Sequence, residues 1–301
     1  GRTLKNGCIR FKLFKLVSME FKAILETRIS EDILEISPLS GGDINQVFLV
    51  RTLGARYVVK RNSKTRFPNM FLKEARGLTT LSEKGVRTPD VKAVFDDTTD
   101  QFLVMEYISQ QPVNKEYWEN FGRSLSKLHQ NSNPNFGLDY NNYIGSLDQV
   151  NAEKKVWTTF FIENRVLPMV KMAFDKQALD KVHVRGFDRL FTVFSKLVPE
   201  EKPALLHGDL WSGNLLCGKG GSPVFIDPAI YYGHRETDIA MTRMFGGFHP
   251  DYLDIYQEEY PLEKGWEKRL SLHNLYPNLV HLVLFGRAYL GGIESVIKNY
   301  V

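Results

Sequence analysis

The chain has 301 residues, of which 43% are hydrophobic and 25% are charged. This is an ordinary globular composition, and its length suits two domains of moderate size or one large one. The formal net charge is +4, but five basic residues and no acidic residue fall within residues 1–18. The remaining chain carries 34 basic and 35 acidic residues, so its charge argues against a nucleic-acid partner.

Residues 1–18 form a basic leader that lacks the continuous apolar stretch of a signal peptide. We interpret it as a remnant upstream of a natural start at Met19, with a basic amphipathic membrane segment as the alternative. The two cysteines, Cys8 and Cys217, do not suggest a disulfide framework. No apolar stretch has the length of a membrane span, so we expect a cytoplasmic protein without a membrane partner.

The first predicted element is an amphipathic helix over residues 20–35, with apolar residues at helical spacing. The loop SGGDIN (40–45) then separates two extended segments, and TLGA (52–55) marks a second turn. FLKEARGLTTLSEKG is a helical pattern that ends at Gly85. Two more strands follow, in VKAVFDD and QFLVMEYI, joined by a polar turn.

After Ile108 the pattern becomes mostly helical. Helices are predicted over 116–130, 154–174 and 179–197, and again from about Tyr252 onward. This order predicts an α+β fold with two lobes. Residues 19–108 would form a small nucleotide-binding lobe with an antiparallel sheet and a helix, and residues 109–301 a larger, mainly helical catalytic and substrate lobe.

The strongest functional signal is HGDLWSGN, residues 207–214. An Asp followed five positions later by an Asn is the spacing of a kinase catalytic loop. In that loop the Asp accepts the proton of the hydroxyl being phosphorylated, and the Asn faces a metal that bridges the nucleotide phosphates. Either residue alone would be an ordinary turn residue, but the joint spacing predicts Asp209 as the catalytic base and Asn214 as a metal ligand.

A second acidic residue, Asp227, follows three apolar residues in VFIDP. The preceding CGKGGSP reads as a turn, so we expect a small hairpin that brings Asn214 and Asp227 together. Carboxylate and amide oxygens suit Mg²⁺, which predicts Asp227 as the second metal ligand.

The upstream half of the chain offers candidates for binding the nucleotide. Lys60 ends the strand pattern YVVK, and Glu74 in the next helix could hold it in an ion pair. A surface lysine and a solvated helix carboxylate are the ordinary alternatives. The following residues complete the nucleotide-binding set, the first three in the loop expected to cover the phosphates and the last three at the lobe junction, where adenine would bind: Gly41, Gly42, Asn45, Met105, Glu106 and Tyr107.

The segments HGDLWSGN and FIDPAIYYGHRETDIAM resemble the fructosamine kinase (ketosamine-3-kinase) family, within the wider group of aminoglycoside and choline kinase-like phosphotransferases. The stretches FGLDYNNYIGSLDQVN (136–151) and WTTFFIENRVLP (157–168) also match, and the resemblance runs from about residue 20 to the C-terminus. It implies a protein-kinase-like fold and Mg²⁺- and ATP-dependent phosphorylation of the 3-hydroxyl of a ketosamine, either a small molecule or a glycated lysine, and hence a role in deglycation.

The resemblance also suggests residues for the sugar and amine end of the site, of which Asp238 could equally cap a helix: Trp211, His234, Arg235, Glu236 and Asp238. We expect a monomer or a weak dimer. Another small-molecule kinase of the same fold, acting on an aminoglycoside, choline or a similar alcohol, is the alternative function, and a non-catalytic nucleotide-binding protein is a third.

Overall fold

The computed structural model describes residues 20–39 and 44–300, and these residues form two compact units. The first unit holds the described residues up to Ala75 together with Pro89–Tyr107, and the second holds Arg76–Thr88 and the chain from Ile108 onward. The chain passes finally from the first unit to the second between Tyr107 and Ile108, beside the predicted lobe boundary at residue 108. Residues 76–88, which were expected in the first lobe, group with the second unit instead. The predicted leader and Gly41 and Gly42 lie outside the described residues.

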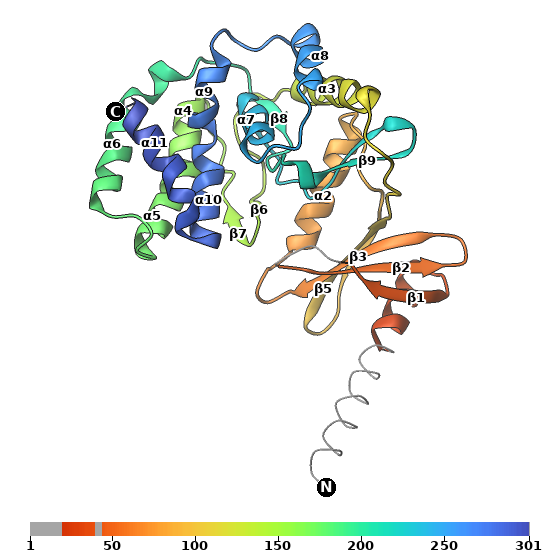
Figure 1. The fold of residues 1–301 in the computed structure, drawn as a ribbon. Coiled ribbons are helices and arrows are strands. Elements are labelled where there is room, and N and C mark those ends of the chain that lie inside the picture. Colours follow the sequence, from red (N-terminus) through yellow and green to blue (C-terminus); the bar gives the residue numbers. More distant parts are fainter. Residues whose placement is uncertain (1–19, 40–43, 301) are drawn as a thin grey trace. The chain divides into compact units, whose positions relative to one another are not determined.

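The first unit is built on a five-stranded antiparallel sheet in the order β1-β2-β3-β5-β4 (Figure 1). Its strands are β1 (Ile33–Pro38), β2 (Gln46–Thr52), β3 (Arg56–Ser63), β4 (Val91–Asp96) and β5 (Asp100–Glu106). Helix α2 (Met70–Glu83) follows β3 and continues into the second unit. This order of strands and helix confirms the prediction for the N-terminal part of the chain.

A helix over residues 20–29 packs on this sheet through Phe21, Leu25 and Ile29, which recur every four residues. The prediction that the helix extends to residue 35 was wrong, because the chain turns at Ser30 with φ of 60° and enters β1 at Ile33. The Glu26 carboxylate accepts a hydrogen bond from the Ile33 N–H at 2.8 Å and so holds the turn. Ile33 continues the four-residue apolar spacing of the helix, but it lies in strand β1.

The second unit is mainly helical and also contains three short two-stranded ladders. Its principal helices are α3 (Lys115–His129), α4 (Trp157–Phe161), α5 (Leu167–Asp175), α6 (Lys181–Leu197), α7 (Glu236–Met244), α8 (Asp251–Glu259), α9 (Trp266–His273), α10 (Leu275–Phe285) and α11 (Leu290–Tyr300). The ladders pair β6 (Asn142–Ile144) with β7 (Leu147–Gln149), β8 (Ala204–Leu206) with β11 (Tyr231–Gly233), and β9 (Leu215–Cys217) with β10 (Pro223–Phe225). The pairing of β8 with β11 was not predicted, since each strand has only three residues.

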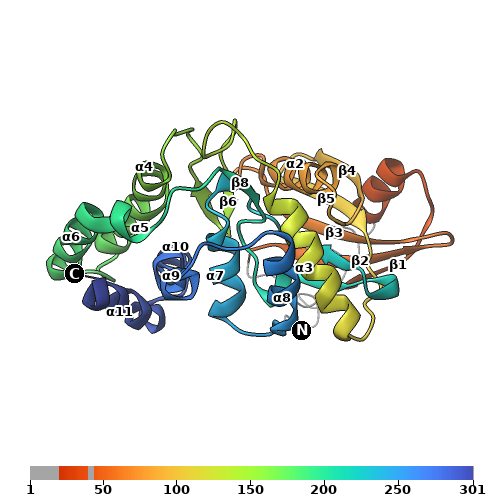
Figure 2. The ribbon, with the colours of Figure 1, turned by 90° about the horizontal axis from the view of Figure 1, so that it is seen from above.

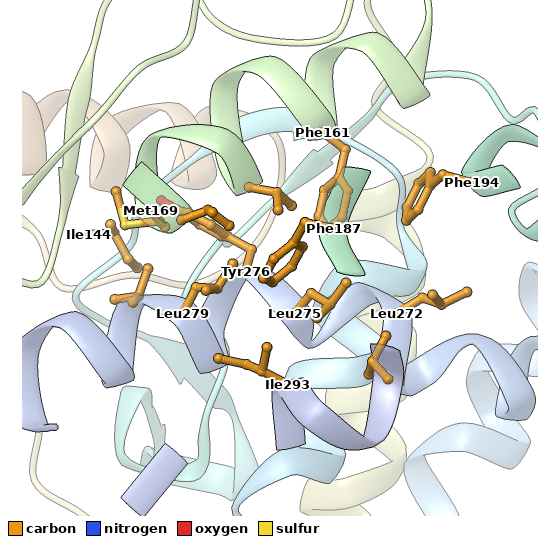
Figure 3. Packing of buried hydrophobic residues seen from close by; sticks show 14 of the residues in the cluster. Ile144, Phe161, Met169, Phe187, Phe194, Leu272, Leu275, Tyr276, Leu279 and Ile293 are labelled. Carbon is orange, nitrogen blue, oxygen red and sulfur yellow. The ribbon is translucent and has the colours of Figure 1, made fainter. Parts of the chain in front are cut away.

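A large apolar cluster joins the helices at one side of this unit (Figure 3). Phe161 of α4, Phe187 and Phe194 of α6, Leu275 of α10 and Ile293 of α11 are all buried in it. Between α4 and α5 the chain forms a π-helical segment, Ile162–Val166, so the predicted helix over 154–174 is one helical run with a wider turn inside it.

Helices α3 and α8 lie side by side in both views (Figures 1 and 2). They approach closely at Gly122, where a Cβ would lie 2.4 Å from the backbone oxygen of Tyr252. This pair backs the strands that carry the catalytic motif, because Phe121 of α3 packs on Phe225 of β10 and on Tyr252. Among the described residues, no helix combines the length and apolar character that crossing a membrane requires.

Candidate active site

The segment 207–214 forms a tight loop between β8 and β9. The Asn214 side-chain nitrogen donates to the backbone oxygen of Asp209 at 2.9 Å and to its carboxylate at 3.0 Å. These two bonds fix both side chains within one loop, as the spacing predicted. They also leave the Asn214 side-chain oxygen as the atom that can face a ligand.

The β9–β10 hairpin brings Asp227 next to this loop. The Ile226 N–H donates to the Asn214 backbone oxygen at 3.1 Å, which joins the two ends of the hairpin directly. The predicted hairpin is therefore present. Asp227 adopts a φ of 53°, a conformation that residues with a side chain rarely take and that the surrounding structure must hold in place.

His207 connects the two arms of the site, which are the catalytic loop 207–214 and the segment 226–230 that carries Asp227. Its imidazole is fully buried; Nε2 donates to the Ile226 oxygen at 2.9 Å, and Nδ1 accepts from the Asp209 N–H at 3.3 Å. Burial lowers the pKa of His207, which favours the neutral ring that this donor–acceptor pattern requires. His207 thus has a structural role in this loop.

Asp238 does not cap a helix, because the N-cap of α7 is Arg235. It lies in the first turn of α7, 1% exposed, and its Oδ2 accepts from the His207 N–H at 2.7 Å while Oδ1 accepts from the Gly208 N–H at 3.0 Å. The Nε2 of His129, at the end of α3, lies 3.2 Å from Oδ2. The predicted capping role of Asp238 was wrong, and its contacts give no support to the predicted ligand contact, because its carboxylate anchors the backbone of the catalytic loop.

Glycine is required at position 208 for two reasons. Its φ is +83°, and a Cβ there would lie 2.1 Å from the Ala229 backbone oxygen. At Gly213 a Cβ would meet the Trp211 indole at 2.1 Å, so the indole lies directly over this glycine. Trp211 is 41% exposed and therefore presents an aromatic surface beside the loop that carries Asp209.

The environment of Asp209 disfavours its ionised form. Burial, followed by the negative charge of Asp227, raises the pKa of Asp209 to about 7, although the Asn214 hydrogen bond acts in the opposite direction. Two carboxylates and an amide oxygen, from the loop and from the end of the adjoining hairpin, form a set of hard oxygen donors, which suits Mg²⁺. Asn214 and Asp227 therefore fit the predicted metal.

The nucleotide-binding residues expected in the first unit include one clear pair. Lys60 Nζ on β3 lies 2.7 Å from Glu74 Oε1 on α2, and the two side chains are only 7% and 12% exposed. The predicted ion pair is thus present, and it is more buried than a surface pair. Asn45 accepts a hydrogen bond from Asn62 at 2.7 Å.

Two backbone N–H groups at the predicted adenine site already donate hydrogen bonds within the protein. The Glu106 N–H donates to the Asp90 oxygen at 2.9 Å and the Tyr107 N–H donates to the Arg56 oxygen at 3.2 Å, while Met105 is 5% exposed within β5. Adenine binding at these residues stays a prediction, and it would need other polar groups than these two N–H groups.

His234, Arg235 and Glu236 are buried and have protein partners. Arg235 donates to both oxygens of Glu201 at 2.9 Å, and Glu236 accepts from Arg269 at 2.5 and 2.8 Å. His234 lies 3.3 Å from the Pro199 oxygen and is 0% exposed. This geometry gives no support to the prediction that these three side chains bind substrate.

Glu236 also forms a compact buried cluster with His234 and His273. Burial raises the pKa of Glu236, but hydrogen bonds from Arg269 and His273 outweigh it and lower the pKa to about 2. Because Arg269 already binds both carboxylate oxygens, the cluster holds α7 and α9 together and needs no cation.

Sequence reasoning missed His129, which orients Asp238, and the strand pairing that places Tyr231 beside the catalytic loop. Neither residue has a local signal, because its partner is about 110 or 25 positions away in the chain. The second unit nevertheless contains a loop with a half-buried Asp and an Asn, followed by a second Asp, and the first unit separately contains a largely buried Lys–Glu pair. These features define a kinase-type phosphotransferase.

Comparison with known proteins identifies the family. The fructosamine kinase family model matches residues 17–301, and the chain belongs to this family. A probable ketoamine kinase of Enterococcus faecium is 37% identical over 268 residues, covering 88% of this chain and 95% of that protein. The chloroplastic protein-ribulosamine 3-kinase of Arabidopsis thaliana is 33% identical, covering 99% and 93%.

A solved structure shares the fold. The crystal structure of a putative fructosamine-3-kinase from Thermobifida fusca superimposes with a TM-score of 0.84 at 31% identity, covering 92% of this chain and 96% of that chain. The predicted two-lobed, kinase-like α+β fold is confirmed by this match.

Proposed function

We propose that this protein transfers the terminal phosphate of ATP to the 3-hydroxyl of a ketosamine. The observation that carries the proposal is the Asp209–Asn214–Asp227 arrangement in a member of the fructosamine kinase family. The sugar-amine adduct is a small ketosamine or a glycated lysine, and phosphorylation at O3 would serve deglycation.

Asp209 is the group that receives the proton of the attacking hydroxyl. Its carboxylate is held by Asn214, its N–H donates to His207, and the preceding Gly208 N–H donates to Asp238, so its position is fixed before substrate arrives. A magnesium ion held by Asn214 and Asp227 would offset the charge on the phosphate oxygens. The hydrogen bonds of the His207 ring to the Asp209 N–H and the Ile226 oxygen keep Asp209 and Asp227 on adjacent segments.

Lys60 would contact the α- and β-phosphates, with Glu74 fixing its ammonium group. Gly41, Gly42 and Asn45 would cover the phosphates, and residues Met105 to Tyr107 would bracket the adenine. These roles in the first unit rest on the positions of the residues and on the Lys60–Glu74 pair.

The exposed Trp211 indole is our candidate for contact with the sugar. It lies over Gly213 in the same loop as Asp209, so a sugar face packed on the indole would bring its hydroxyl near the base. Substitution of Trp211 by Ala should raise the KM for the ketosamine more than the KM for ATP.

A phosphorylation screen tests the proposal. With Mg²⁺ and ATP, the protein should consume ATP in the presence of ribulosyl-lysine or fructosyl-lysine and should ignore choline and an aminoglycoside. Selective turnover of choline or the aminoglycoside would instead support the alternative function. Asp209→Ala should abolish transfer and leave ATP binding largely intact, and wild-type turnover by this variant would overturn the assignment of the base.

A further inference from the structure

Arg165 is a fully buried arginine whose guanidinium has no carboxylate partner among the residues that the structure describes. Its Nη1 donates to the backbone oxygens of Val150 and Asn164, and its Nη2 donates to Asn151 Oδ1 at 2.7 Å. A buried charge without a counter-charge is costly, and arginine is almost never fully buried unless paired. The charge therefore needs an explanation.

Three aromatic rings surround this charge. The guanidinium carbon lies 4.0 Å from the ring centre of Tyr231, 4.6 Å from that of Phe160 and 5.3 Å from that of Tyr276. These cation–π contacts compensate part of the desolvation. Arg165 lies in the π-helical segment 162–166, and such segments occur frequently at functional sites.

A chain of buried side chains leads away from Arg165. Asn151 Nδ2 donates to Asn142 Oδ1 at 2.8 Å, and Gln149 Nε2 donates to the same oxygen at 2.9 Å. The Tyr276 hydroxyl donates to Gln149 Oε1 at 3.0 Å. Arg165, Asn151, Asn142, Gln149 and Tyr276 thus form one connected set, which we call the amide network.

The amide network ends on the segment that follows Asp227. Gln149 donates to the Ala229 backbone oxygen at 3.0 Å, and Asn142 donates to the Ile230 backbone oxygen at 2.8 Å. The Ala229 N–H in turn donates to the His207 oxygen at 2.9 Å. The same few residues therefore connect the amide network to both arms of the site.

Tyr231 provides a second connection. Its ring lies under the Arg165 guanidinium, and its Cε1 is 3.4 Å from where a Cβ on Gly208 would be. Tyr231 also pairs in register with Leu206, which directly precedes the catalytic loop. The guanidinium thus supports the turn at Gly208 as well as the segment after Asp227.

We propose that Arg165 and the amide network are positioning residues that hold Asp227 in its left-handed conformation and so preorganise the metal-binding arm of the site. This inference rests on the proposed function in that it takes Asp227 as a metal ligand. The stretches 136–151 and 157–168 resemble the fructosamine kinase family, but the catalytic motif does not explain them. The inference gives a role to residues in both stretches.

Metal binding without turnover is the appropriate measurement. Mn²⁺ is titrated into the protein with a non-hydrolysable ATP analogue, and free Mn²⁺ is followed by electron paramagnetic resonance. Substitution of residues that orient metal ligands commonly weakens metal affinity or activity about 10-fold or more, and we expect a loss of this size in both Mn²⁺ affinity and kcat for Arg165→Met. Arg165→Lys keeps the charge but not the fork of donors, so it should restore only part of both.

A matched pair of tyrosine variants keeps the test independent of folding. Tyr276→Phe removes one buried hydroxyl within the amide network, and Tyr252→Phe removes one that bonds Thr242 outside it. We expect weaker Mn²⁺ binding and a lower kcat for Tyr276→Phe alone, with comparable thermal stability for the two variants. Unchanged Mn²⁺ affinity and kcat in Tyr276→Phe and Arg165→Met would overturn the inference.

Asp227→Asn separates this inference from the proposed function. If Asp227→Asn abolishes Mn²⁺ binding while the network variants bind normally, the metal site stands and only the positioning role fails. If Asp227→Asn binds Mn²⁺ like the wild type, Asp227 is not a ligand and both ideas fail together.

Discussion

Substitution of Asp238 by Asn tests how the catalytic loop is anchored. The Asp238 carboxylate accepts from the N–H groups of His207 and Gly208 and contacts His129. An asparagine keeps one acceptor oxygen and turns an NH₂ group toward one of these donors. Each hydrogen bond to a charged group contributes about 1.5–3 kcal/mol, so losing one and weakening the others should cost about 3 kcal/mol of unfolding free energy.

The effect on catalysis should be larger than the effect on stability suggests. Displacement of the Gly208–Asp209 turn moves the proton acceptor, and a shift of about 1 Å can lower a rate by roughly 10²-fold. Urea unfolding and steady-state kinetics measure the two effects, with Asp188→Asn on the exposed face of α6 as the control for removing a charge. If Asp238→Asn matches Asp188→Asn in both stability and kcat, the anchoring role is refuted.

Two further predictions concern backbone geometry and pH. Gly208→Ala should severely reduce stability and activity because the added Cβ would collide with Ala229, whereas Gly220→Ala, which also has positive φ but open space around it, should cost only about 1 kcal/mol by thermal unfolding. Because the folded-state pKa of Glu236 is lowered to about 2, its contribution of about 3 kcal/mol should be present above pH 4.5 and lost as the pH falls toward 2. Glu236→Gln should flatten the pH dependence of unfolding in that window, and an unchanged slope would contradict the ion pair with Arg269.

The local features of the site were predictable from the sequence. Asp209 and Asn214 lie five residues apart, and the turn between β9 and β10 fixes where Asp227 falls, so the spacing alone brings these groups together. The Lys60–Glu74 pair was equally accessible, because a strand and the following helix position it. The helix over 20–29 was predicted too long, since Ile33 fits both a helical and a strand pattern.

The longer-range features could not be predicted in this way. Asp238 looked like a helix-starting residue, and only the folded chain shows that its carboxylate meets a loop 30 positions earlier. Similarly, His234 to Glu236 have the polar character of ligand-binding residues, but partners such as Arg269 satisfy them inside the protein. Burial and pairing, which composition and spacing do not report, decide the roles of these residues.

The position of the transferred phosphate is the most direct test of the account. The protein is incubated with Mg²⁺, ATP and ribulosyl-lysine or fructosyl-lysine, and the product is examined by ¹H–³¹P correlation NMR. We predict a phosphate ester whose phosphorus couples to the proton on C3 of the sugar, together with an equal amount of ADP. A phosphate on another sugar carbon, or ATP hydrolysis without any sugar ester, would contradict the assignment as a ketosamine 3-kinase.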